Sequence, residues 1–242
     1  YQPQVRLGDT AAVGCEALIR WFKPDGEMVS PDVFIPLAEY TGLIVEIGDW
    51  VLAEACRQLV RWDAEGLPPI RVGINISAAQ FREPDFVSKI LAQIHETGID
   101  PSRLELEITE SVAVEDPESV ARQLRELKTL GFSVAVDDFG CGFSSLGSLN
   151  RLPFDRVKID RAFVRELTPD TAEGCIARMI VKLADSLGLK VTAEGVETES
   201  QAELLESMGC EEMQGFLYGC PMPAGTFRTW MNTRFGGLLS RL

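Results

Sequence analysis

Residues 133–146 read SVAVDDFGCGFSSL, a short strand pattern that runs into a glycine-rich loop. Val134 and Val136 alternate with small or polar residues, which is typical of a strand with one buried face. The pattern then reaches two adjacent carboxylates, Asp137 and Asp138, whose charges repel each other and are costly to bury. This pair at the end of a strand indicates a site where bound cations offset that cost.

Strand patterns recur along the whole chain and alternate with helical ones. Amphipathic helical patterns such as residues 49–66 and 117–131 separate most of the strands, and several end in glycine. Eight strands with helical connections predict an α/β fold, a (β/α)8 barrel that forms a single domain over residues 1–242. An open antiparallel sheet with one wet face is the alternative, and the helices between the strands argue against it. The other expected strands are residues 4–7, 14–21, 71–77, 104–109, 156–160, 190–196 and 212–216.

The two faces of these strands differ consistently. One face carries branched apolar residues such as Val72 and Ile74, which we expect to pack against the outer helices. The opposite face is polar and must point into the barrel, where apolar residues are usual. Most of the inward polar residues lie in the second half of their strands, at the rim where barrel enzymes have active sites: Asn75, Glu107, Asp137, Lys158 and Glu194.

Acidic residues dominate this inward face. The expected acids are Glu16, Glu105, Glu107, Asp137, Asp138, Asp160 and Glu194, against the cations Arg20 and Lys158. Such an excess of negative charge predicts bound metal, and oxygen ligands suit Mg²⁺, Mn²⁺ or Ca²⁺. The number of carboxylates favours two ions bridged by Asp137, with Asp138 on the second ion. Two metals on oxygen ligands commonly serve phosphate ester chemistry.

Composition excludes several classes of function. The formal net charge of −14 disfavours polymeric nucleic acid and anionic membrane surfaces as partners. No apolar run is long enough to span a bilayer. The six cysteines follow no zinc or disulfide spacing, which predicts reduced thiols in a cytoplasmic protein. The single histidine, His95, lies in the helical pattern of residues 85–98 and is expected on its surface, so a histidine base is excluded. The chain starts without Met and is expected to be a fragment of a longer protein.

Seven ordered motifs resemble one known family. They are EALIRW (16–21), NIS (75–77), LEITES (106–111), DDFGCGFSSL (137–146), KIDRAF (158–163), AEGVET (193–198) and MQGF (213–216). Together they resemble the EAL-domain phosphodiesterases of bacterial cyclic-di-GMP signalling, and the resemblance covers essentially the whole chain. It implies a modified TIM barrel whose first strand is antiparallel to the others. It also implies metal-dependent hydrolysis of one phosphodiester bond of cyclic-di-GMP to linear pGpG.

The resemblance also implies roles for individual residues. The first metal would be held by Glu16, Asn75, Glu107 and Asp137, and the second by Asp137 and Asp138. Lys158 and Glu194 resemble the catalytic pair at the attacking water, while Arg20 and Leu18 resemble substrate-binding residues. Mg²⁺ or Mn²⁺ is expected to support turnover, and Ca²⁺ to bind but inhibit. Supporting positions, near the water or in the loop that couples metal binding to dimer contacts, are Gln214, Glu110, Phe139, Gly140 and Ser144.

Two acids have two interpretations each, and a third is expected to be structural. Glu197 is expected either to support the metal site or to cap the helix that follows it. Asp160 belongs either to the site or to an ion pair with Lys158 or Arg161. Glu105 lies lower in the barrel, where a structural role is expected.

Two other functions compete with the phosphodiesterase hypothesis. A receptor would bind cyclic-di-GMP without cleaving it, but relatives of that kind usually lack some of these ligands. An aldolase-type barrel would use Lys158 as a Schiff-base amine, but the surrounding acids would keep that amine protonated. We expect a homodimer formed through the helices beside the 137–146 loop. The parent protein is expected to carry a regulatory sensor or cyclase domain and to be membrane-anchored or free.

Overall fold

The computed structural model describes residues 1–8, 11–109, 112, 116–140, 152–169 and 171–239, with side chains described up to residue 233. No helix among these residues combines the length and apolar character needed to cross a membrane. The predicted loop residues Glu110 and Ser144 lie outside the described residues.

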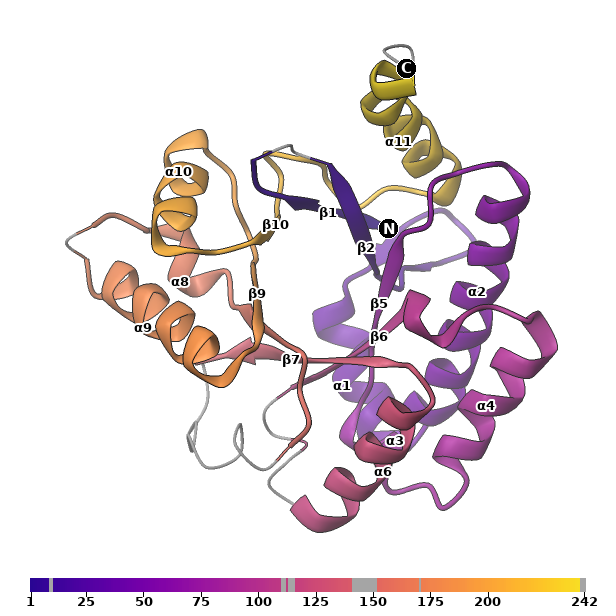
Figure 1. Ribbon diagram of the computed structural model, residues 1–242. Helices are drawn as coiled ribbons and strands as arrows, with labels where there is room; N and C mark the ends of the chain where they lie inside the picture. The colour runs from indigo at the N-terminus through magenta and orange to yellow at the C-terminus, as the bar shows by residue number, and fades with distance from the viewer. Residues whose placement is uncertain (9–10, 110–111, 113–115, 141–151, 170, 240–242) are drawn as a thin grey trace.

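Within the described residues, eight strands close into a barrel in the order β1-β10-β9-β8-β7-β6-β5-β2 (Figure 1). β1 pairs antiparallel with both of its neighbours, and the other neighbouring strands pair in parallel. The predicted barrel and its antiparallel first strand are therefore confirmed. The strands are β1 Gln2–Arg6, β2 Ala12–Ala17, β5 Arg71–Asn75, β6 Leu104–Thr109, β7 Ser133–Phe139, β8 Arg156–Ile159, β9 Lys190–Ala193 and β10 Glu212–Gln214.

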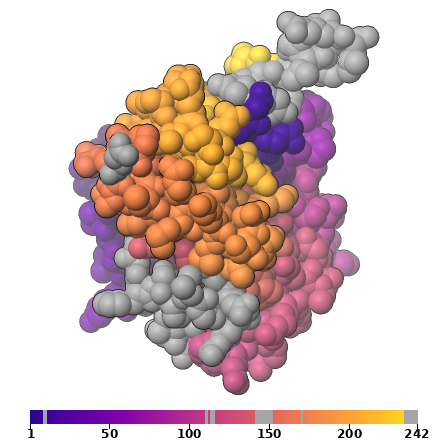
Figure 2. Space-filling model, turned by 60° about the vertical axis from the view of Figure 1, so that its left-hand side comes forward, coloured from indigo at the N-terminus to yellow at the C-terminus, as the bar shows by residue number. Residues whose placement is uncertain are grey.

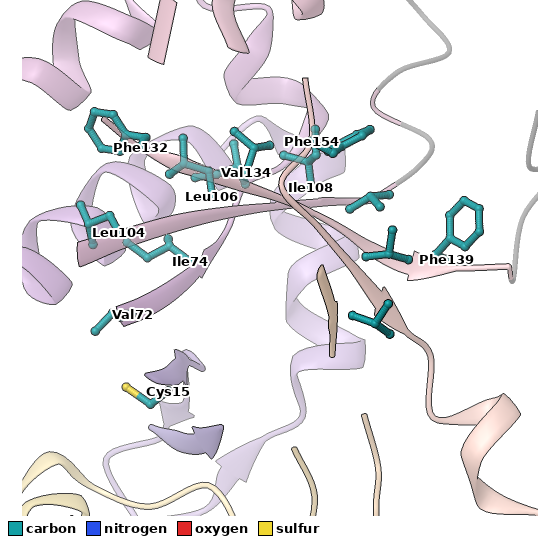
Figure 3. Packing of buried hydrophobic residues seen from close by; sticks show 14 of the residues in the cluster. Cys15, Val72, Ile74, Leu104, Leu106, Ile108, Phe132, Val134, Phe139 and Phe154 are labelled. Atoms are coloured by element: carbon teal, nitrogen blue, oxygen red, sulfur yellow. The ribbon is translucent and has the colours of Figure 1, made fainter. Parts of the chain in front are cut away.

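Strand alternation places the apolar side chains as expected. Four apolar strand residues are fully buried: Val72, Ile74, Leu104 and Leu106. They face away from the barrel interior and pack toward the outer helices. Figure 3 shows this layer, with Val134 of β7 and Phe154, which precedes β8, continuing it. The core of the protein thus lies between the barrel and its helices, which leaves the barrel interior to polar residues.

The helices cover the barrel from outside. They are α1 Pro31–Thr41, α2 Ile44–Ala64, α3 Ala78–Phe81, α4 Phe86–Thr97, η1 Pro101–Arg103, α6 Pro117–Thr129, α8 Ala162–Arg165, α9 Ala172–Leu187, α10 Glu199–Met208 and α11 Ala224–Leu239. In Figure 1, α1 to α6 lie on one side of the barrel and α8 to α10 on the other, and Figure 2 shows α9 and α10 covering that second side.

Local sequence explains where several helices begin and end. Asp116 caps α6 by accepting a hydrogen bond from the Ser119 N–H (3.0 Å), and Pro117 follows at the first helical position. α4 and α9 end at Gly98 and Gly188, which adopt the left-handed conformation that glycine tolerates best.

The structure shortens most of the predicted strands at their carboxyl ends, and three of these corrections move site residues off a strand. β2 ends at Ala17, so Leu18 and Arg20 lie in the connection that follows and not on a strand. β8 and β9 end at Ile159 and Ala193, so Asp160 and Glu194 are each the first residue after a strand. A short hairpin that the sequence patterns did not predict, β3 Trp21–Phe22 with β4 Met28–Val29, follows the β2 connection.

Candidate active site

Five strands bring charged side chains together inside one end of the barrel. Glu16 comes from β2, Glu107 from β6, Asp137 from β7 and Lys158 from β8, and all four are buried. Glu194 joins them directly after β9. The strand registers align Asn75 with Glu107 and Thr109 with Asp137, so these residues lie near the carboxyl ends of the strands. We call Glu16, Glu107, Asp137, Lys158 and Glu194 the rim cluster.

Lys158 lies at the centre of the rim cluster. Its Nζ atom is 2.6 Å from Glu107 Oε2 and 2.7 Å from Glu194 Oε1. The same atom is 3.2 Å from Asp137 Oδ1 and 3.6 Å from Glu16 Oε2. Burial alone would lower the pKa of Lys158, but the surrounding carboxylates, Glu107 first, outweigh it and hold the pKa well above its usual value. Lys158 is therefore a buried cation.

Two amide side chains fix Glu16. Asn75 Nδ2 donates to Glu16 Oε1 at 2.7 Å, and Gln214 Nε2 donates to Glu16 Oε2 at 2.6 Å. Burial raises the pKa of Glu16, but Lys158 and these hydrogen bonds outweigh it and lower the pKa below its usual value. Glu16 is therefore an ionised, oriented carboxylate. Because Asn75 uses its nitrogen here, its carbonyl oxygen remains as a possible metal ligand.

Asp137 and Asp138 point to the same site although they are adjacent in the sequence. Strict alternation would place them on opposite faces, but the pairing of β7 with β8 shifts register between Val136 and Phe139. Asp138 adopts a positive φ of 51°, the one non-glycine residue among those described to do so. Carboxylate oxygens of Asp137, Asp138 and Glu194 then lie within 4.8 Å of one another. Such backbone strain is typical of functional sites.

The rim cluster holds more negative charge than Lys158 neutralises. Burial raises the pKa of Glu107 well above its usual value, and the neighbouring Glu16 and Asp137 add to the rise. Burial likewise raises the pKa of Glu194 to about 8. Glu107 Oε1 is buried and has no hydrogen-bond partner. A buried carboxylate oxygen without a donor, in an all-oxygen cluster, fits coordination to a hard divalent cation.

Metal-ligand geometry supports the same interpretation. Oxygens of Glu16, Glu107 and Asp137 lie within 4.8 Å of one another, as do those of Asp137, Asp138 and Glu194. Asp137 belongs to both groups, as expected for a residue shared between two ions. The residues present therefore fit divalent metal binding.

Comparison with known proteins assigns the family. Residues 1–221 match the family described as EAL domain. The chain belongs to the EAL domain family. It is 45% identical over 224 residues to the Pseudomonas aeruginosa protein named bifunctional diguanylate cyclase/cyclic di-GMP phosphodiesterase MucR, covering 93% of this chain and 33% of that protein. It is 39% identical over 231 residues to the cyclic di-GMP phosphodiesterase PA2567 of the same organism, covering 96% of this chain and 39% of that protein.

Solved structures agree with this assignment. The structure titled PaMucR phosphodiesterase, c-di-GMP complex, has a TM-score of 0.89 and 44% identity, and the match covers 94% of this chain and 92% of that one. The EAL domain of Mycobacterium smegmatis DcpA has a TM-score of 0.81 and 34% identity, with 96% and 94% covered. This EAL domain spans about a third of the length of the curated relatives it matches.

A pocket opens beside the rim cluster of this EAL domain. Its volume is about 370 Å³, and its lining includes Asn75, Glu107 and Asp138. Both predicted substrate-binding residues, Leu18 and Arg20, also line it. The guanidinium of Arg20 donates to the Ile19 carbonyl at 2.9 Å. Much of the remaining lining is apolar and comes from α1 and α2, through Ile35, Ile44, Ile47 and Val51. A ligand with flat apolar faces and anionic groups fits this arrangement.

The remaining predicted residues take supporting positions. Gln214 donates a hydrogen bond to Glu16. Asp160 accepts a hydrogen bond from the Ala162 N–H (2.7 Å) and lies beside Asp138. Burial, with the neighbouring Asp137, raises the pKa of Asp138 to about 6. Phe139 is buried in the core.

The N-terminal cap of α10 excludes one interpretation of Glu197, that of a capping residue. Thr198 caps α10 together with Gln201, so Glu197 is not the cap; its backbone N–H donates to the side chain of Gln201 instead. Gly140, directly after β7, has a φ of 100°, a left-handed conformation that glycine tolerates best.

Three charged residues inside the barrel were not predicted from the sequence: Arg71, Arg156 and Glu212. Arg156 donates to Glu105 at 3.0 Å and to Glu212 at 3.1 Å, and Arg71 donates to Glu212 at 2.7 Å. The predicted list of inward cations, Arg20 and Lys158 only, was therefore wrong. Strand parity could have found all three, because Arg156 shares a face with Lys158, Arg71 with Asn75, and Glu212 with Gln214. The lower layer of Arg71, Glu105, Arg156 and Glu212 is balanced, so the excess negative charge is concentrated in the rim cluster. The structural role expected for Glu105 is confirmed.

Proposed function

We propose that this EAL domain hydrolyses one phosphodiester bond of cyclic-di-GMP and releases linear pGpG. The observation that carries the proposal is the rim cluster, whose metal-compatible carboxylates border a pocket lined by Arg20 and Asn75. Named relatives are cyclic-di-GMP phosphodiesterases, and one related structure holds cyclic-di-GMP. An acidic protein can bind this anionic substrate only where cations offset its charge.

The ligand assignment follows the geometry of the carboxylates. Glu16, Asn75, Glu107 and Asp137 would hold one ion, and Asp137 and Asp138 a second. Mg²⁺ or Mn²⁺ supplies activation of water and stabilisation of charge on the phosphoryl oxygens in sites of this kind. Ca²⁺ would bind the same oxygens with longer, more variable geometry and support little turnover.

The other residues of the site position the reactants. Glu194 and Lys158 lie 2.7 Å apart beside Asp137, where they would orient the attacking water. Lys158 remains protonated and would donate a hydrogen bond toward developing negative charge, while Glu194 would accept a proton from the water. Arg20 would contact a substrate phosphate, and Leu18 would contact the adjoining nucleoside.

The direct test is incubation with cyclic-di-GMP and Mg²⁺ followed by mass analysis of the products. We expect a mass gain of one water and the appearance of pGpG. Tight binding with recovery of intact cyclic-di-GMP would support the alternative, a receptor that does not cleave its ligand. Trapping of a carbonyl compound on Lys158 by borohydride would instead indicate Schiff-base chemistry, which the carboxylates around Lys158 oppose.

The assembly is part of the proposal. We propose a homodimer formed through the helices beside the 137–146 loop, within a longer protein that carries a regulatory sensor or cyclase domain. The share of each relative that this chain covers, about a third, supports the second part. Sedimentation velocity would measure the assembly state.

A further inference from the structure

α1 presents three faces with three different surroundings. Phe34 and Ala38 are buried against the rest of the protein. Pro31, Ile35 and Glu39 line the pocket beside the rim cluster. Val33, Leu37 and Tyr40 form the third face, at the i, i+4 and i+7 spacing of a single helical stripe, and they expose 64%, 57% and 91% of their surface. We call this third group the α1 outer face.

Other exposed apolar side chains lie on the segments beside α1. Trp21, Phe22 and Met28 of the β3–β4 hairpin and Leu43 at the end of α1 are each about half exposed or more. The Trp21 ring packs edge-on against Phe34 of α1, with ring centroids 5.7 Å apart, so the hairpin is fixed to the helix. Scattered single exposures are normal, but a group of seven exposed apolar residues around one helix is typical of a protein interaction site.

The relatives indicate what kind of partner covers this surface. The chain spans about a third of their length, and the name of one relative assigns it a second activity, that of a diguanylate cyclase. A further domain of the same polypeptide is therefore the occupant that these relatives indicate for the α1 outer face.

Chain geometry permits a partner from the same polypeptide. The ring of Tyr1 packs against Trp62 near the end of α2, with centroids 4.9 Å apart. α2 has 21 residues, or about 30 Å, and begins where α1 ends. About ten residues of extended chain joined to Tyr1 would therefore span the length of α2, to the end at which α1 precedes it.

We propose that the α1 outer face and the β3–β4 hairpin dock an apolar helical face of another domain of the same polypeptide. The occupant is expected to present leucine-sized or aromatic residues at helical spacing, because the surface offered is a straight apolar stripe beside an aromatic hairpin. Since α1 also lines the pocket, the docked domain contacts the helix that shapes one wall of the site.

Thiol accessibility tests the docking directly. Val33→Cys is prepared in the 242-residue domain and in the longer polypeptide that contains it, and maleimide labelling at each cysteine is followed by peptide mass spectrometry. The exposed Cys175 on α9 and Cys220 serve as internal references. We expect Cys at position 33 to react at the rate of the references in the isolated domain. In the longer polypeptide it should react at least about tenfold more slowly.

A second substitution identifies the contact. Leu37→Glu in the longer Val33→Cys polypeptide should restore fast labelling, whereas Met179→Glu, at a residue 70% exposed on α9, should leave position 33 protected. Equal labelling rates in the domain and the longer polypeptide would overturn the proposal, as would protection that survives Leu37→Glu. Protection in the isolated domain that grows with its concentration would identify a second copy as the occupant and also overturn it. The measurement uses no substrate and does not depend on the proposed activity.

Discussion

Lys158 shows how a single residue sets the charge of the site. It is fully buried, yet its ammonium contacts four carboxylates, so the protein holds it as a cation rather than as a base. A fixed positive charge next to the attacking water gains interaction energy as the phosphate becomes more negative. Such an interaction favours the transition state over the bound substrate.

Lys158→Ala should therefore lower kcat by about 10²–10³, the usual effect of removing one electrostatic donor. The affinity for cyclic-di-GMP measured in Ca²⁺, where turnover is suppressed, should change little. Lys158→Arg should rescue poorly, because a planar guanidinium does not fit the position of an ammonium among packed carboxylates. Stopped-flow turnover and calorimetry in Ca²⁺ give the two quantities. Loss of binding with a normal kcat would mean that Lys158 anchors the substrate instead.

Asp137 and Asp138 should differ in their effects on metal binding. Asp137 belongs to both groups of clustered carboxylates, whereas Asp138 belongs to one. Asp137→Asn should weaken both ions, and Asp138→Asn should chiefly weaken one. Calorimetric titration with Mn²⁺ should show the larger loss of affinity for Asp137→Asn. Equal and small losses at the two positions would contradict the shared-ligand assignment.

Strand alternation predicted most of the rim cluster, because burial on a strand follows period two. It could not predict how Asp138 joins Asp137, since that depends on a register shift and a positive φ that only the β7–β8 pairing reveals. Arg71 and Arg156 were missed for a different reason. Arginine at the start of a strand is usually exposed, and its burial here depends on Glu105 and Glu212 from distant strands.

The lower layer of the barrel stabilises the strands that carry the site. Although burial raises the pKa of Glu212, Arg156 and Arg71 outweigh it and lower the pKa below its usual value. A carboxyl group whose pKa falls on folding stabilises the protein above its unfolded pKa of about 4.3, and that contribution is lost as the pH falls through the folded value. Low pH should therefore weaken this layer.

Glu212→Gln should lower the free energy of unfolding by about 3 kcal/mol at pH 7, because it leaves the two largely buried arginines with Glu105 as their one remaining carboxylate partner among the described residues. The difference from the parent protein should shrink as the pH falls from about 4.3 toward the lower folded pKa. Urea denaturation at pH 7, 4 and 3.5 measures this. Glu65→Gln, which breaks an exposed pair with Arg228, is the control and should change stability by less than about 1 kcal/mol. A constant difference at all three pH values would contradict the linkage.

The packing of neighbouring strands explains Gly73 in β5. A Cβ atom there would collide with the carboxylate of Glu107 on β6, so the glycine provides the space that Glu107 occupies. Gly73→Ala should displace Glu107, weaken Mn²⁺ binding by at least about tenfold and destabilise the fold by about 1–3 kcal/mol. Gly225→Ala in α11 is the matched control, because nothing lies near its added methyl group. Unchanged Mn²⁺ affinity in Gly73→Ala would show that Glu107 has room to move.

Across the whole molecule, the barrel interior combines a balanced lower layer with a negatively charged rim. The eight strands and the longer helices α2, α4 and α6 were predictable because each has a clear apolar face. The β3–β4 hairpin was not predicted, since its strands have only two residues each and their apolar side chains are exposed. The rim cluster gathers four carboxylates around the single cation Lys158, so bound cations should affect the stability of the entire barrel.

Metal removal should therefore weaken both activity and folding. In excess EDTA we expect no hydrolysis of cyclic-di-GMP and a lower Tm, because the carboxylates around Lys158 repel one another. Mg²⁺ or Mn²⁺ at about 100 times its Kd should stabilise the fold by about 2.7 kcal/mol and restore turnover, whereas Ca²⁺ should raise the Tm with little turnover. Calorimetric melting of the parent protein and of Asp137→Asn separates site binding from general screening, since only site binding requires Asp137. If Asp137→Asn gained as much stability from Mg²⁺ as the parent, the ions would act on the surface rather than in the barrel. Full activity in EDTA would exclude the metal-dependent mechanism itself.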